Sequence, residues 1–178
     1  MMTKRMVWSA TPLAVFLILY ACEGEAPPGR SSDNGDMHEA MIGTNKILLE
    51  IENQDIIDFI DRYGWETRET GSGLRYYIYR QGNGPRARSG QTAVINYSVR
   101  LLTGDLVYSS DEKGPRRFRI GRGGVESGLE EGIVLLRVGD RAKFILPAHL
   151  AHGLPGDGER IPQRAAIVYD VELIELID

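Results

Sequence analysis

The chain has 178 residues, a formal net charge of −4 at pH 7 and a single cysteine, Cys22. That length fits one domain with appended segments. The well-mixed charge lacks the basic stripe of a nucleic-acid-binding domain, so we expect no nucleic-acid partner, and one cysteine excludes an intramolecular disulfide.

Residues 1–21 are typical of a secretory signal peptide. Lys4 and Arg5 precede a mostly apolar stretch that runs from Val7 to Tyr20, and a short apolar segment after a basic start is the signature of export. The stretch is shorter than the roughly 20 residues that a membrane-spanning helix needs.

The signal segment ends in a motif that resembles the cleavage site of bacterial lipoproteins, Leu19-Tyr20-Ala21-Cys22. The resemblance implies cleavage before Cys22 and acylation of its thiol. We therefore expect a protein of the cell envelope, held by lipid on a bacterial membrane at its periplasmic or outer-membrane face. An uncleaved anchor and a conventional signal peptide are the alternatives.

Residues 22–44 favour a flexible tether, because most of this segment is rich in Gly, Pro, Ser and acidic residues and offers little to bury. Residues 45–65 predict an amphipathic helix, since apolar side chains recur at helical spacing between charged ones. Thr44 or Asn45 is its candidate cap, Asn53 a candidate break and Gly64 its end. The apolar stripe either packs on its own domain or docks on another surface.

Residues 66–178, with a core at 88–176, predict an α+β domain. Runs of aromatic and β-branched residues between Gly-containing turns favour strands at 74–79, 92–102, 106–108, 118–120, 141–146 and 166–177. One helix is expected at 128–136. Many strands and one short helix together predict an antiparallel sheet wrapped on that helix.

Several short motifs follow one another between Gly90 and Asp178. They include Gly128-Leu129-Glu130-Glu131-Gly132, Val138-Gly139-Asp140, Ala151-His152-Gly153 and Tyr169-Asp170-Val171-Glu172-Leu173. This series resembles the FKBP-type peptidyl-prolyl isomerases. The whole chain resembles the lipid-anchored members of Bacteroidota, including the one associated with gliding motility. The resemblance implies a half-open antiparallel β-sheet around one short α-helix, and isomerase activity without a metal or other cofactor.

The resemblance also implies the site. The residues expected at the reacting bond are Tyr97, Tyr108, Glu126 (through its backbone N–H), His152 and Tyr169. The residues expected to bind the substrate are Val107, Phe118, Val125, Leu129 as the pocket floor, and Ile161.

Three positions depart from the family pattern. Val107-Tyr108 replaces the usual Phe-Asp pair, so the family's aspartate is missing. His152 replaces the tyrosine of Ala-Tyr-Gly, although an imidazole can still donate a hydrogen bond. Arg116 replaces an aromatic residue that follows the turn proline.

Two other patterns have plain alternatives. His149 and His152 lie three residues apart, but no further ligand follows at a usual spacing, so we expect no metal site. The basic segment from Arg116 to Arg122 is either a solvated strand edge or a contact for an acidic partner.

The X-Pro imide bond rotates over a barrier of about 18–20 kcal/mol, and its twisted transition state loses charge separation. A water-poor apolar pocket with hydrogen bonds to the flanking peptide should therefore lower that barrier. We expect a monomeric isomerase that assists the folding of exported proteins, with proline-containing polypeptides and, through Cys22, the membrane as partners. A low-activity FKBP-like chaperone or assembly module is the alternative, and a purely structural role is the third.

Overall fold

The structure, a computed structural model, describes residues 33–178. The expected signal peptide, Cys22 and the start of the expected tether lie outside these residues. Contacts divide the chain into a first unit that ends at Glu39 and a second unit, Ala40–Asp178, which holds the domain described below.

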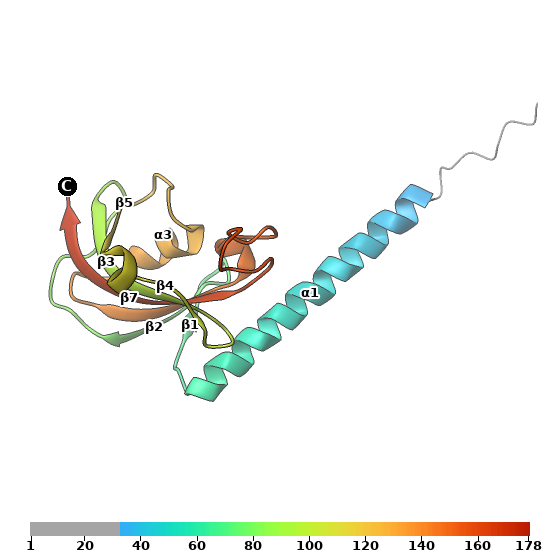
Figure 1. The fold of residues 1–178 in the computed structure, drawn as a ribbon, viewed down its shortest axis with the longest axis horizontal. Helices are drawn as coiled ribbons and strands as arrows, with labels where there is room; N and C mark the ends of the chain where they lie inside the picture. Colours follow the sequence, from blue (N-terminus) through green and yellow to red (C-terminus); the bar gives the residue numbers. More distant parts are fainter. Residues whose placement is uncertain (1–32) are drawn as a thin grey trace, which may run out of the picture. The chain divides into compact units, whose positions relative to one another are not determined.

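An antiparallel sheet forms most of the second unit (Figure 1). Its strands are ordered β1-β2-β6-β7-β3-β4, with β5 paired to β3. Their bounds are β1 Arg68–Glu69, β2 Arg75–Arg80, β3 Thr92–Leu101, β4 Leu106–Ser109, β5 Arg116–Arg119, β6 Arg141–Leu146 and β7 Ile167–Ile177. The helical segments are α1 Asp33–Tyr63, α2 Ser110–Lys113, α3 Ser127–Ile133 and the 3-10 turn η1 Ala148–Leu150.

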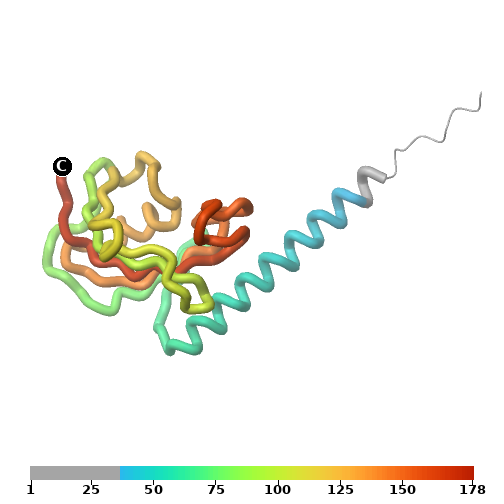
Figure 2. The backbone as a smooth tube through the Cα atoms, viewed as in Figure 1, coloured from blue at the N-terminus to red at the C-terminus, as the bar shows by residue number. Residues whose placement is uncertain are grey.

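Helix α3 lies against the curved inner face of the sheet (Figures 1 and 2). Leu129 and Ile133 of α3 are fully buried, as is Phe144 of β6. A side chain at Gly132 would come within 2.6 Å of the Phe144 ring, so the glycine lets helix and sheet approach closely. The predicted antiparallel sheet around a short helix is confirmed.

Helix α1 is longer than predicted. It begins at Asp33 rather than at residue 45, so Thr44 and Asn45 lie inside it, and it runs unbroken through Asn53. The prediction followed apolar periodicity, which residues 33–44 lack, although they contain no proline to interrupt a helix. Gly64 ends the helix as expected, with a positive φ of 62°.

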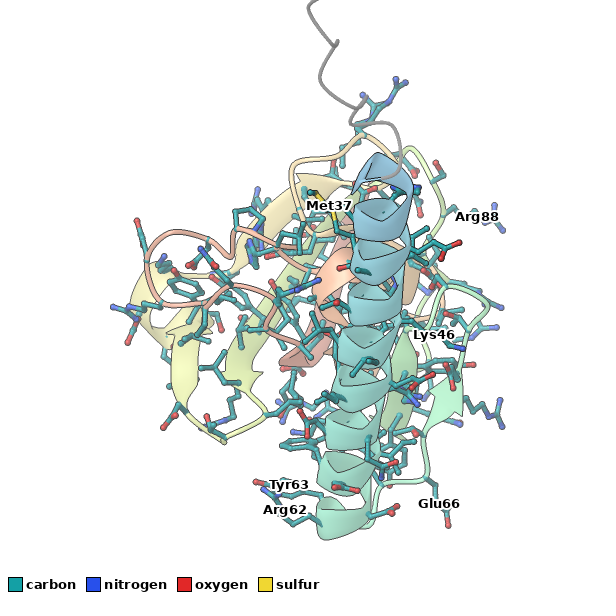
Figure 3. The ribbon with its side chains drawn as sticks, turned by 90° about the vertical axis from the view of Figure 1, so that its right-hand side faces the viewer. Met37, Lys46, Arg62, Tyr63, Glu66 and Arg88 are labelled. Carbon is teal, nitrogen blue, oxygen red and sulfur yellow. The ribbon has the colours of Figure 1, made fainter. Side chains whose placement is uncertain are left out.

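Only the C-terminal turns of α1 pack on the domain. Ile56, Phe59 and Ile60 are buried with Ile145 and Val168 of the sheet. By contrast, the apolar side chains at 47, 49 and 51 are each more than half exposed. Figure 3 shows the part of α1 from Lys46 to Tyr63 with its side chains.

Three short elements were not predicted: α2, β1 and η1. α2 follows β4 directly, and Ser109 caps it by accepting a hydrogen bond from the backbone N–H of Glu112 at 3.4 Å. β1 consists of two residues at the edge of the sheet. In addition, α3 ends at Ile133 rather than at residue 136. Across residues 33–178, none of the helices has the length and apolar character needed to cross a membrane.

Candidate active site

A cavity of about 570 Å³ opens beside α3. β3, β4, β5, β7, the start of α3 and the loop after η1 all contribute side chains to it. Its lining includes all five residues expected at the reacting bond: Tyr97, Tyr108, Glu126, His152 and Tyr169. Residues that are far apart in the sequence thus meet at one site.

Two tyrosine rings form an aromatic corner of this cavity. Tyr97 on β3 and Tyr169 on β7 are diagonal neighbours on paired strands, with ring centroids 6.2 Å apart and planes inclined by 43°. Tyr169 is only 1% exposed. Burial and then the nearby charge of Glu126 raise the pKa of its hydroxyl well above the usual value, so it remains a neutral hydrogen-bonding group.

The residues expected to bind the substrate lie in the core beneath these polar groups. Leu129 is fully buried, and the side chain of Val125 packs against the same core. Buried in this layer as well are Val107, Phe118 and Ile161. They belong to the main core or pack against it, and none of the five is part of the cavity lining.

A buried carboxylate, that of Glu126, links three other groups of the site. Its side chain is 8% exposed. Its Oε2 lies 3.1 Å from Nη1 of Arg116, and its Oε1 lies 3.1 Å from Nε2 of His152. The same Nη1 of Arg116 donates to the Tyr169 hydroxyl at 3.2 Å. We expected only the backbone of Glu126 to matter, whereas its side chain also enters the cavity.

A second carboxylate, which the sequence reasoning missed, faces the cavity from the loop after η1. The Tyr108 hydroxyl donates to Oδ2 of Asp157 at 2.5 Å. Oδ1 of Asp157 accepts the backbone N–H groups of residues 159, 160 and 161 at 2.8–3.0 Å. An Asp before Gly in a turn commonly folds back in this way, so Asp157-Gly158 was the available signal.

These bonds shift two pKa values in opposite directions. Burial alone would raise the pKa of Asp157, but the hydrogen bonds from Tyr108 and from three backbone N–H groups outweigh it and lower that pKa to about 2. The hydrogen bond to Asp157, followed by burial, raises the pKa of Tyr108 to about 12. At neutral pH, Asp157 is thus an anion that holds a neutral phenol.

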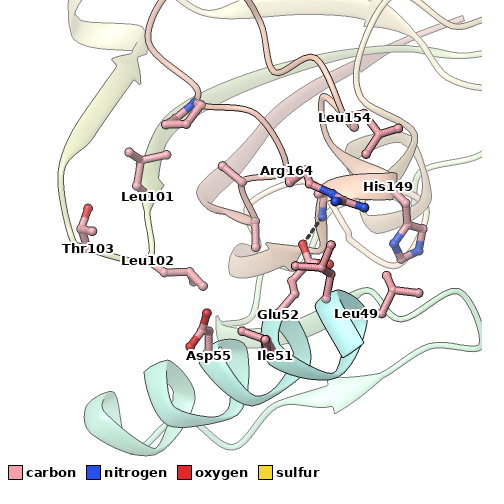
Figure 4. A pocket seen from close by; sticks show the side chains of 16 residues that line it. Leu49, Ile51, Glu52, Asp55, Leu101, Leu102, Thr103, His149, Leu154 and Arg164 are labelled. Atoms are coloured by element: carbon pink, nitrogen blue, oxygen red, sulfur yellow. Dashed lines mark hydrogen bonds between the residues drawn. The ribbon is translucent and has the colours of Figure 1, made fainter. Parts of the chain in front are cut away.

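Both η1 and the loop after it are tied to α1. Oε1 of Glu52 accepts the backbone N–H of Ala148 at 2.6 Å, and Nη2 of Arg164 donates to Oδ1 of Asn45 at 3.0 Å. Between these links lies a hollow of about 500 Å³, which Leu49 and other apolar side chains line (Figure 4). Polar links therefore connect the exposed turns of α1 to η1 and to the loop that carries two groups of the site.

His149 and His152 have different surroundings. Nε2 of His149 lies 2.9 Å from the backbone oxygen of Ser72, whereas His152 contacts Glu126. Among residues 33–178, no three His, Cys, Asp or Glu side chains lie close enough together to hold a metal ion.

Comparison with known proteins identifies the domain. Residues 84–174, just over half of the chain, match the family model described as FKBP-type peptidyl-prolyl cis-trans isomerase. The chain belongs to this FKBP-type isomerase family. The family and the enzyme class predicted from the motifs are thus confirmed.

Individual relatives agree with this FKBP-type assignment. FK506-binding protein 2 of Dictyostelium discoideum is 39% identical over 90 residues, which are 50% of this chain and 68% of that protein. A probable FKBP-type peptidyl-prolyl cis-trans isomerase, FkpA, of Neisseria meningitidis is 34% identical over 61% of this chain, but the match spans only 40% of the Neisseria protein. The crystal structure of AtFKBP13 superposes with a TM-score of 0.60 and 31% identity, covering 62% of this chain and 98% of that one.

Within this FKBP-type domain, the missing aspartate of β4 has a counterpart. Tyr108 stands at its position, yet its hydroxyl bonds Asp157, so a carboxylate still lies at the cavity from another element. Arg116 in turn stands where the family has an aromatic ring, and it pairs with Glu126. This FKBP-type site therefore combines an aromatic corner with the Arg116–Glu126 ion pair and the Tyr108–Asp157 hydrogen bond.

Proposed function

We propose that this protein is a lipid-anchored peptidyl-prolyl isomerase of the cell envelope that assists the folding of exported proteins. The observation that carries the proposal is the Tyr97–Tyr169 corner, which lines a cavity of about 570 Å³. It acts as a monomer on proline-containing segments. A role in gliding motility stays a prediction from the sequence resemblance.

The chemistry follows from the state of the imide bond. A planar X-Pro imide carries separated charge that water stabilises, and the twisted transition state carries less. Aromatic and aliphatic surroundings therefore favour the twisted state relative to the planar one. The backbone N–H of Glu126, at the start of α3, holds the substrate carbonyl, and the neutral Tyr169 hydroxyl adds a donor that does not require a buried charge.

Export is supported by the sequence before the domain. The basic start, the apolar stretch and the Leu19-Tyr20-Ala21-Cys22 motif favour acylation of Cys22. Two or more acyl chains would hold the protein on a membrane stably, whereas a single chain gives reversible binding. Labelled fatty acid should enter the wild-type protein and should be absent from a Cys22→Ser variant.

Assistance in folding has its own test. A reporter protein whose slow refolding phase is limited by an X-Pro bond should refold faster in the presence of the full chain. A Tyr97→Ala variant, which removes a partly exposed ring from the cavity, should lose most of this effect. If both proteins leave the slow phase unchanged, the folding role is wrong.

A second candidate is a binding module with little turnover. The Glu126 network favours it, because the Arg116–Glu126 ion pair brings charge to a site that should be apolar for rapid catalysis, and His152 adds a polar ring. Such a module would bind proline-containing peptides without accelerating their exchange.

A further inference from the structure

One lip of the cavity is strongly basic. Five of the ten residues from 113 to 122 are Lys or Arg and none is acidic, although the chain as a whole has a net charge of −4. These residues are Lys113, Arg116, Arg117, Arg119 and Arg122, and they are called the basic lip below. They come from the end of α2, from β5 and from the turn that follows it.

Most of this charge has no acidic partner. Among the side chains that the structure describes, only Arg116 of the basic lip forms an ion pair, with Glu126. Nζ of Lys113 lies 4.1 Å from the ring centroid of Tyr108, and Nε of Arg119 donates to the backbone oxygen of Gly90 at 2.9 Å. Neither contact neutralises a charge, so four of the five cations remain available to an acidic ligand.

The basic lip is continuous with the isomerase cavity. Lys113, Arg116 and Arg117 belong to the cavity lining. The alternation along β5 buries Phe118 and leaves Arg117 and Arg119 exposed. The strand therefore presents cations in a row that leads outward from the site.

The lining of the cavity also contains acidic side chains. Asp157 and Glu159 belong to this lining, and Asp157 already accepts hydrogen bonds from Tyr108 and from three backbone N–H groups. The Asp157 carboxylate is thus already engaged, whereas Lys113 and Arg117 in the same lining form no ion pair with any described side chain.

We propose that the basic lip binds acidic side chains of the same polypeptide whose proline occupies the cavity. The preferred clients then carry Asp or Glu within a few residues of the X-Pro bond, on the side that faces Arg117. Arginine suits this role because its planar guanidinium can bind a carboxylate through two hydrogen bonds. The inference rests on the proposed function, since it assigns the substrate class of that cavity.

An acidic polypeptide fits these observations better than an anionic membrane surface. Three of the five cations line the cavity that would hold the proline. A flat layer of lipid headgroups could not enter this cavity to contact them. The aromatic corner beside them also matches a proline ring rather than a headgroup.

The test is a set of binding measurements on the full chain. Fluorescence anisotropy would give the dissociation constants of labelled Ala-Leu-Pro-Phe peptides that carry two Glu, two Gln or two Lys residues, placed before or after this core. We expect one of the two Glu peptides to bind about tenfold more tightly than its Gln counterpart at low salt. The ratio of the affinities for the Glu and Gln peptides should approach one as the salt concentration is raised from about 0.02 M to about 0.5 M, because exposed charges are screened.

Charge-reversed variants locate the effect. The double variant Arg117→Glu, Arg122→Glu should lower the ratio of the affinity for the Glu peptide to the affinity for the Gln peptide to one or below. Arg68→Glu, an exposed change in β1 at the far end of the sheet order, should leave this ratio unchanged. The ratio is taken within one variant, so a general loss of folded protein does not alter it. Equal binding of the Glu and Gln peptides, or a preference that survives the reversal, would overturn the proposal.

Two further outcomes distinguish the polypeptide proposal from lipid binding and from the proposed isomerase function. Flotation of the full chain with phosphatidylcholine vesicles, with or without phosphatidylglycerol, tests a lipid surface. A response to the anionic lipid that Arg117→Glu abolishes, together with equal binding of all peptides, would assign the lip to lipid and overturn the polypeptide proposal. A Glu preference without any acceleration of imide exchange would support the basic lip and contradict only the isomerase function.

Discussion

Glu126 and Arg116 form an ion pair inside the isomerase cavity, with Oε2 and Nη1 3.1 Å apart. His152 contacts the other oxygen of the same carboxylate, and Arg116 also reaches the Tyr169 hydroxyl. A charge pair that touches both the aromatic corner and the loop after η1 should matter for stability as well as for catalysis.

Replacing Glu126 with Ala should reduce the free energy of unfolding by about 2 kcal/mol. Loss of one partner from a buried pair typically costs 3–5 kcal/mol because the other charge is left uncompensated; here the cost should be smaller, since the Arg116 side chain is 30% exposed. Urea unfolding measures the change. A Glu126→Leu, Arg116→Leu double variant should lose less than Glu126→Ala. If Glu126→Ala is as stable as the wild type, the pair has no such role.

Asp157 should make the stability of the domain depend on acid pH. Its pKa is lowered from 3.8 to about 2 in the folded chain, so the ionised group stabilises the fold above about pH 4, and this contribution is lost as the pH falls through about 2. Asp157→Asn keeps a carbonyl acceptor but loses the charge. The wild type should exceed the variant in stability by a constant amount near neutral pH, and the difference should shrink between pH 4 and pH 2. A difference that grows in this range contradicts the assignment.

The link between α1 and the loop after η1 should support the site. Glu52→Ala removes the acceptor for the N–H of the buried Ala148, which should cost about 1–2 kcal/mol. Amide hydrogen exchange should accelerate from Ala148 to His152, and isomerase activity should fall. Glu50→Ala is the matched control, because the exposed Glu50 forms, among the described residues, only a long ion pair with Lys46, at 4.0 Å. Equal exchange in the two variants would show that the loop does not depend on α1.

The C-terminal turns of α1 should contribute to the fold through packing. Ile56 is 1% exposed, so Ile56→Ala should cost about 2–5 kcal/mol, as large-to-small changes in a core do. Ile47 is 57% exposed, and Ile47→Ala should change thermal stability little. Similar losses in both variants would mean that the exposed turns of α1 are covered by another surface.

The sequence predicted the domain well because its signals are local. Alternating strands, turn glycines and the Gly128–Gly132 motif specify the sheet and α3 within a few residues, as the bounds of β3 and β6 show. The start of α1 could not be found in this way, since residues 33–44 form a helix without a regular apolar stripe. α2 was missed because a four-residue helix has no periodicity to detect.

The family resemblance predicted which residues lie together at the cavity, while the roles of these residues stay predictions. The family resemblance brought Tyr97, Tyr108 and Tyr169 to one cavity, and the structure places them there. The pairing of Arg116 with Glu126 and of Tyr108 with Asp157 depends on side-chain contacts between separate strands and loops. No local pattern encodes such contacts, although two departures from the family pattern, at 108 and 116, marked the places where new partners were needed.

The central claim is that this cavity accelerates rotation about an X-Pro bond. Two-dimensional exchange NMR on Ala-Leu-Pro-Phe would measure the cis–trans rate with the full chain and with its Tyr97→Ala variant. Uncatalysed exchange takes tens to hundreds of seconds. The account predicts clear acceleration by the wild type and a loss of at least about tenfold in the variant. A folded wild-type chain that leaves the uncatalysed rate unchanged would contradict the isomerase account and favour a binding module.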